Sequence, residues 1–166
     1  MPALKGKELA DNIKYSTHVS LNHSFVLAGI FAIWFAISRI AGFAHLTNVH
    51  YLNYVFAFFM AYDALNKSYL HKREYINYFS GMMIGLVTVM LAHLWYSIVF
   101  FFYLLIDQNF THLLLHKVPQ IFLAPELSIS VMVFSEGAGL SVITGLVLIQ
   151  YFQWRKKMDP YLDNRR

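Results

Sequence analysis

This chain of 166 residues is 58% hydrophobic and only 13% charged, a balance that excludes an ordinary soluble domain because so much apolar surface cannot be buried at this length. The sequence has no cysteine, which excludes disulfides, thiolate metal sites and cysteine nucleophiles within it. The net charge is +4, but the basic residues gather beside apolar segments, so we do not expect a nucleic-acid partner.

Four apolar segments predict membrane-spanning helices at residues 24–44, 51–65, 78–106 and 127–152. The second is short and aromatic. The third is longer than the roughly 20 residues that a span needs, so we expect it to tilt or to protrude. No repeat or low-complexity linker divides the chain. We therefore predict an all-α, multi-pass membrane protein with one transmembrane domain over residues 1–166, built as a four-transmembrane-helix bundle.

Lysine and arginine are distributed unevenly around these segments. All but two of the 13 basic residues lie in the N-terminal tail, in the C-terminal tail or between the second and third segments. The two exceptions are Arg39, inside the first segment, and Lys117. Basic segments stay on the cytoplasmic side of a membrane. This pattern predicts that both termini are cytoplasmic.

Residues 107–126 form the only sizeable segment on the predicted outer side, and they are unusually apolar for a loop. We expect a short helix lying in the outer interface there, with a cap over the mouth of the bundle as the alternative. Four of the eight histidines fall on this side, at His45, His50, His112 and His116. The i,i+4 spacing of His112 and His116 suits zinc or copper, but further ligands would have to come from a distant loop. We predict no metal and no cofactor.

Small residues share one face on three of the predicted helices. These faces are Ala28, Ala32, Ala36 and Gly42 on the first helix, Gly81, Gly85, Thr88 and Ala92 on the third, and Gly137, Ser141, Thr144 and Gly145 on the fourth. Small residues let helix backbones approach closely in lipid, where no hydrophobic force brings helices together. We interpret these faces as seams inside the bundle, with a dimerisation seam as the alternative.

Four ionisable side chains lie within the apolar segments: Arg39, Asp63, His93 and Glu136. At about 1.5 Å per residue, Arg39, His93 and Glu136 reach similar depths, roughly 22–24 Å from the cytoplasmic side. An unpaired charge there costs at least about 2.5–3.5 kcal/mol, so we predict an Arg39–Glu136 ion pair with His93 nearby. Arg39 reaching the outer surface is the alternative. For Asp63 we expect an interfacial i,i+4 pair with Lys67, or else a proton-carrying carboxylate.

The third helix reads Tyr-Ile-Asn-Tyr-Phe-Ser-Gly-Met-Met-Ile-Gly-Leu over residues 75–86 and leads to residues 103–110, and the fourth contains Gly-Leu-Ser-Val-Ile-Thr-Gly at 139–145. These stretches resemble a small bacterial four-helix membrane family catalogued as domain of unknown function 4199. That family usually has Ile-Asp-Pro after its long helix, where this chain has Ile-Asp-Gln at 106–108. The resemblance covers helices two to four and implies a multi-pass inner-membrane protein. It implies no activity and carries over no functional residues.

No nucleophile elbow, phosphate loop or pair of catalytic carboxylates occurs, so we assign no catalytic residue and favour a non-enzymatic role. The short loops, aromatic surfaces and small-residue seams favour an accessory or scaffold subunit. It would pack in the lipid bilayer against other membrane proteins or its own copies. One alternative is a small-solute, ion or proton transport component that uses a buried Arg39/His93/Glu136 site. Another is a redox or lipid-modifying membrane enzyme subunit.

Overall fold

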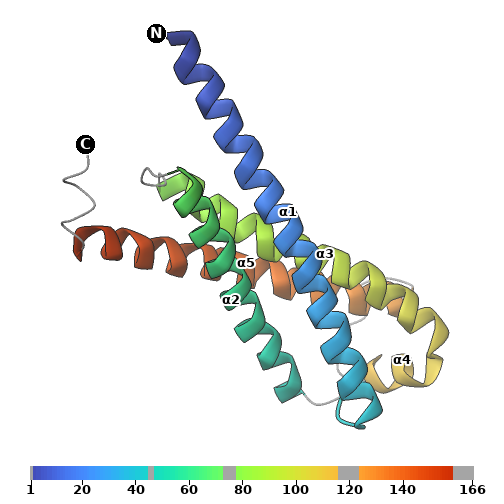
Figure 1. Cartoon of the computed structure of the whole chain (residues 1–166). Coiled ribbons are helices and arrows are strands. Elements are labelled where there is room, and N and C mark those ends of the chain that lie inside the picture. The colour runs from blue at the N-terminus through green and yellow to red at the C-terminus, as the bar shows by residue number, and fades with distance from the viewer. Residues whose placement is uncertain (1, 45–46, 73–77, 116–123, 159–166) are drawn as a thin grey trace.

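The computed structural model of the protein describes residues 2–44, 47–72, 78–115 and 124–158. Every regular element in these residues is an α-helix, and the helices follow one another as α1 (Pro2–Ile40), α2 (Thr47–Lys72), α3 (Tyr78–Ile106), α4 (Gln108–Leu115) and α5 (Pro125–Met158) (Figure 1). The all-α prediction is confirmed.

One predicted helix has the boundaries that its apolar run indicates, and another ends earlier than predicted. The third predicted helix, 78–106, coincides with α3. The first is expected to run to residue 44 but ends at Ile40, because Gly42 turns the chain with a φ of 80°. The N–H of Phe43 donates to the carbonyl of Ser38 at 3.0 Å, which closes the helix with a Schellman motif.

Among the described residues, three helical stretches are long and apolar enough to cross a membrane, namely Ile13–Ile40, Tyr78–Ile106 and Pro125–Trp154. They make this a membrane protein with several spans. The predicted span at 51–65 lies within α2, which is not among the three. The short helix expected within 107–126 is present as α4, and its place at a membrane interface stays a prediction.

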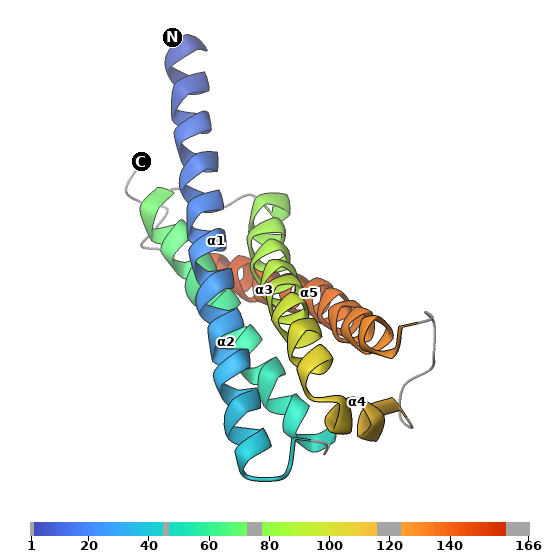
Figure 2. The same cartoon turned by 90° about the vertical axis from the view of Figure 1, so that its right-hand side faces the viewer.

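Helix α3 is the centre of the arrangement. It packs against α1, α2, α4 and α5, whereas α1 and α5 do not pack against each other within the described residues. Figure 2 shows α1 and α2 side by side, with α5 crossing at a steep angle. The N-terminal part of α1 extends beyond the other helices in both views (Figures 1 and 2). The first and last spans are therefore linked only through the other helices of the described structure, α3 foremost and α2 besides.

The small residues of α3 and α5 form the seam that the sequence predicts. All eight of them are buried, and a Cβ added to Gly85 would lie 3.1 Å from the Cα of Gly145. The alanine face of α1 is different, and the expectation of a bundle seam is wrong there. Ala36 is exposed and Ala28 and Ala32 are only partly buried, so no neighbouring helix closes against this face.

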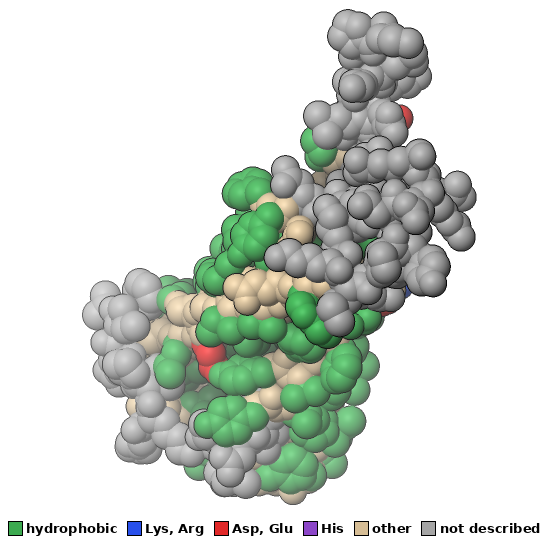
Figure 3. Space-filling view, turned by 90° about the vertical axis from the view of Figure 1, so that its left-hand side faces the viewer, with side chains coloured by type: hydrophobic (Ala, Val, Ile, Leu, Met, Phe, Trp, Pro, Cys, Tyr) green, Lys and Arg blue, Asp and Glu red, His purple; other side chains and the backbone are tan. Residues whose placement is uncertain are grey.

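The outer surface is largely apolar, as expected for side chains that face lipid. Large hydrophobic side chains are more than half exposed on every span, including Ile33, Phe79, Val99, Phe102 and Ile143. Figure 3 shows one such face, where hydrophobic side chains surround a small acidic patch. A charged side chain on this apolar surface therefore requires a specific explanation.

Candidate functional site

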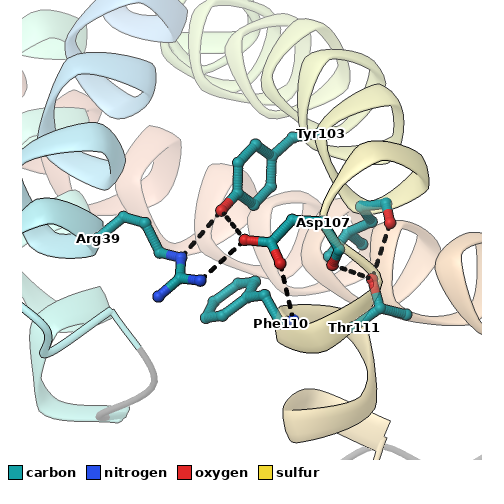
Figure 4. A network of polar contacts seen from close by, with 6 residues as sticks. Arg39, Tyr103, Asp107, Phe110 and Thr111 are labelled. Atoms are coloured by element: carbon teal, nitrogen blue, oxygen red, sulfur yellow. Dashed lines mark hydrogen bonds and ion pairs between the residues drawn. The ribbon is translucent and has the colours of Figure 1, made fainter.

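The clearest polar network joins the end of α1 to the corner between α3 and α4 (Figure 4). Arg39 donates from Nη2 to Oδ2 of Asp107 at 2.8 Å and from Nε to the Tyr103 hydroxyl at 2.9 Å. The Tyr103 hydroxyl in turn donates to the same Oδ2 at 2.6 Å. These three side chains close a ring of hydrogen bonds where α1 meets the junction of α3 and α4.

Asp107 is placed by the start of α4. It is the residue between α3 and α4, and its Oδ1 accepts the backbone N–H of Phe110 at 3.0 Å, the geometry of a helix N-cap. The Arg39 guanidinium lies 4.9 Å from the centre of the Phe110 ring. Hydrogen bonds from the Tyr103 phenol, the Arg39 guanidinium and this N–H lower the pKa of Asp107 from 3.8 to about 2.

The Arg39–Glu136 ion pair predicted from the sequence is wrong. Arg39 lies on α1 and Glu136 on α5, and these two helices do not pack against each other within the described residues. Arg39 pairs with Asp107, while Oε1 of Glu136 accepts a hydrogen bond from the Tyr54 hydroxyl of α2. By sequence alone, Asp107 belongs to the outer segment. An aspartate directly after an apolar run is an N-cap signal that could have drawn attention to it.

His93 is part of the packing between helices. Its Nδ1 donates to the carbonyl of Val89 at 2.9 Å, and its ring lies 4.8 Å, centre to centre, from the ring of Phe31. A Cβ on Gly137 would come within 2.0 Å of its Cγ, so the imidazole fills the space that this glycine leaves. His93 thus lies beside the residue that follows Glu136, but it has no hydrogen bond to Arg39 or Glu136, both of which the structure describes.

The predicted Asp63–Lys67 pair is confirmed, and a third side chain, His23, joins it. Nζ of Lys67 lies 2.7 Å from Oδ2 of Asp63. Nε2 of His23, on α1, lies 2.9 Å from the same oxygen. His23 precedes the first predicted span by one residue and is not among the predicted site residues. A contact between residues 40 positions apart leaves no local pattern in the sequence.

The predicted metal ligands lie mostly outside the described residues. His45 and His116 are not described, nor is the side chain of His50, and His112 lies exposed on α4. Within the described part of the chain, no group of three or more histidine, aspartate or glutamate side chains is arranged to hold a metal ion.

An open groove lies between α1 and α3 and has a volume of about 320 Å³. Its lining includes Ala32, Ala36, Arg39, Tyr96, Phe100 and Tyr103. The small alanine side chains form the groove because no larger side chain fills the space above them. Its walls are apolar except where Arg39 and Tyr103 meet.

Comparison with family models, with curated proteins and with solved structures finds no match to this chain. The resemblance to domain of unknown function 4199 therefore stays an expectation drawn from the residues alone.

Proposed function

We propose that this protein is an accessory or scaffold subunit of the membrane that binds another membrane protein, or a second copy of itself. The binding surface is the exposed face of α5 that carries Met132, Ser135, Glu136, Gly139 and Ile143, called here the open face of α5. The observation that carries the proposal is the placement of Glu136. It lies well inside the Pro125–Trp154 span, and its side chain is exposed. Its hydrogen bond comes from Tyr54, a neutral phenol. In lipid such a carboxylate costs at least about 2.5–3.5 kcal/mol, and a partner that supplies a donor or a cation would offset this.

The surface around Glu136 also suits a neighbouring helix. Gly139 lies about one turn further along, is exposed, and would have no atom within 4 Å of an added Cβ. Ser135 is exposed on the same side. Small residues at this position admit a second helix backbone at close range, whereas bare lipid requires neither small nor polar residues. Exposed Met132 and Ile143 flank them and provide apolar contact.

We also propose that α2 is a fourth span and that both termini are cytoplasmic, in the inner membrane of a bacterium. Helices α1 and α3 run in the same direction, and α2, which lies between them in the sequence, runs the opposite way (Figure 2). This course supports α2 as the helix by which the chain returns across the membrane before α3 begins. The basic residues of the two tails support the cytoplasmic side.

Neither alternative function gains support from a specific contact. A transport site built from Arg39, His93 and Glu136 would need these groups to share one cavity. Arg39 instead bonds to Asp107 and Tyr103 at the end of α3. A redox or metal enzyme would need ligands, and the described residues offer no cluster of them.

Single cysteines test the proposed partner face, because the native chain contains none. Gly139→Cys is labelled in intact membranes with a thiol-reactive photo-cross-linker, which on irradiation couples to C–H bonds within reach, alongside Ile33→Cys on the exposed side of α1 as a matched control. We expect a discrete adduct from position 139, identified by mass as a second copy or a defined membrane protein, and none from position 33. The adduct should weaken when Glu136→Ala is added. A chain that stays monomeric at position 139 and in native mass spectra from mild detergent would refute the proposal.

A further inference from the structure

We propose that His23, Asp63 and Lys67 form a proton-binding site that holds α1 against α2. The site is separate from the open face of α5 and does not depend on it. His23 lies within the Ile13–Ile40 span, and its side chain is 10% exposed, whereas those of Asp63 and Lys67 are 45% and 52% exposed. The histidine is therefore enclosed, while its two partners reach the surface and give a proton a way in.

Both ring nitrogens of His23 face oxygen atoms that accept hydrogen bonds. Nδ1 lies 2.7 Å from the carbonyl oxygen of Val19, which has no hydrogen to donate, so Nδ1 carries one. Nε2 lies 2.9 Å from Oδ2 of Asp63. Lys67 contacts that same oxygen at 2.7 Å, which keeps the carboxylate ionised. With a proton on Nε2 as well, both contacts become hydrogen bonds and the ring is an imidazolium.

Lys67 gives the site a second stable arrangement. Its Nζ lies 3.3 Å from Nε2 of His23, close enough to donate to that nitrogen once the nitrogen is bare. Loss of the proton would leave Nε2 and the Asp63 carboxylate as two acceptors facing each other, which is repulsive. The ammonium then becomes the donor to the ring. The site thus passes from a charge of +1 to 0 by exchanging one hydrogen bond between α1 and α2 for another.

Few other charges act on this ring. Helix α1 packs only against α2 and α3 within the described structure. Residues 78–106 of α3 include no aspartate, glutamate, lysine or arginine, and their single histidine, His93, packs on Phe31 further along α1. On α1 itself, His18 is exposed one turn away. Asp63 and Lys67 are therefore the charged side chains that contact this ring in the described structure, and their charges are opposite.

The test is nitrogen NMR of the full chain with ¹⁵N-labelled histidine in lipid nanodiscs, which separates protonated from bare ring nitrogens. Spectra are recorded at about pH 5.5 and about pH 8.5, on either side of the ordinary histidine value of about 6.5. The His23→Asn variant assigns the signal, and His18→Asn assigns an exposed histidine of the same helix as the control. We expect two protonated nitrogens for His23 in the acidic spectrum. In the basic spectrum we expect only one, because Nε2 no longer donates to Asp63.

Two variants separate a proton site from a packing contact. Asp63→Asn should lower the doubly protonated fraction of His23 at a fixed pH, and Lys67→Gln should raise it, while neither changes His18. Because the expected signs are opposite, general loosening of the fold cannot produce both, and Lys67→Gln alone decides if Asp63→Asn does not fold. A His23 ring with one bare nitrogen at about pH 5.5, well below the ordinary value, or a fraction unchanged by Lys67→Gln, would overturn the proposal.

Discussion

Gly85 of α3 and Gly145 of α5 face each other at close range where the two helices cross. A Cβ built on Gly145 would lie 2.9 Å from the carbonyl oxygen of Met82, and one built on Gly85 would lie 3.1 Å from the Cα of Gly145. The atoms in the way belong to the backbone, which cannot swing aside as a side chain can. The crossing of α3 and α5 therefore depends on glycine at these two positions.

We expect Gly145→Ala to lower the free energy of unfolding by about 1–3 kcal/mol, the usual effect of overpacking a tight contact. The measurement is the apparent Tm in mild detergent. Gly29→Ala serves as the control, because an added Cβ there meets no atom within 4 Å. Equal Tm changes for the two variants would show that the crossing tolerates a methyl group.

The close contact between Gly137 and His93 predicts that substitutions at these two positions have coupled effects on stability. Gly137→Ala should destabilise the protein by about 1–3 kcal/mol, because the new methyl group overlaps the imidazole ring. Adding His93→Ala removes the ring that is in the way, so the double variant should lose less stability than the two single variants together. A double-mutant cycle of apparent Tm values measures this coupling, and strict additivity would contradict it.

Two substitutions at Asp107 separate its cap from its charge. Asp107→Asn keeps an N-cap oxygen for the Phe110 N–H but removes the charge that faces Arg39. Asp107→Ala removes both and should cost about 0.5–2 kcal/mol more through the lost cap. The half-exposed Arg39–Asp107 ion pair adds only about 0–1 kcal/mol. Unfolding of the three proteins is compared in one detergent, and an asparagine variant as unstable as the alanine variant would count against the cap.

Acid should weaken the junction between α1 and α4. The pKa of Asp107 falls from 3.8 to about 2 in the folded chain, so the unfolded chain takes up this proton first as the pH drops. The stabilisation from this carboxylate is therefore complete well above 3.8 and is lost as the pH approaches about 2. Apparent Tm measured from about pH 5 to about pH 2 should fall more steeply in the native chain than in Asp107→Asn. Parallel curves would mean that another group controls the acid response.

Local features of the chain were enough to predict several parts of the structure. The apolar run at 78–106 coincides with α3, because hydropathy and helix length depend only on neighbouring residues. The Asp63–Lys67 pair follows from i,i+4 spacing on one helix. The small faces of α3 and α5 form a buried seam, since periodicity places such residues on one side of a helix.

The choice of neighbours between helices came only from the tertiary structure. Depth along a helix predicted that Arg39 and Glu136 lie at one level, but depth says nothing about direction around the axis or about which helix lies between them. Because α1 and α5 do not pack against each other in the described structure, Arg39 bonds instead to Asp107, 68 positions away, and Glu136 lies exposed on α5. The contact between His23 and Asp63 likewise depends on which helices pack together, here α1 and α2. Such pairs depend on how whole helices pack, and no short stretch of sequence records that.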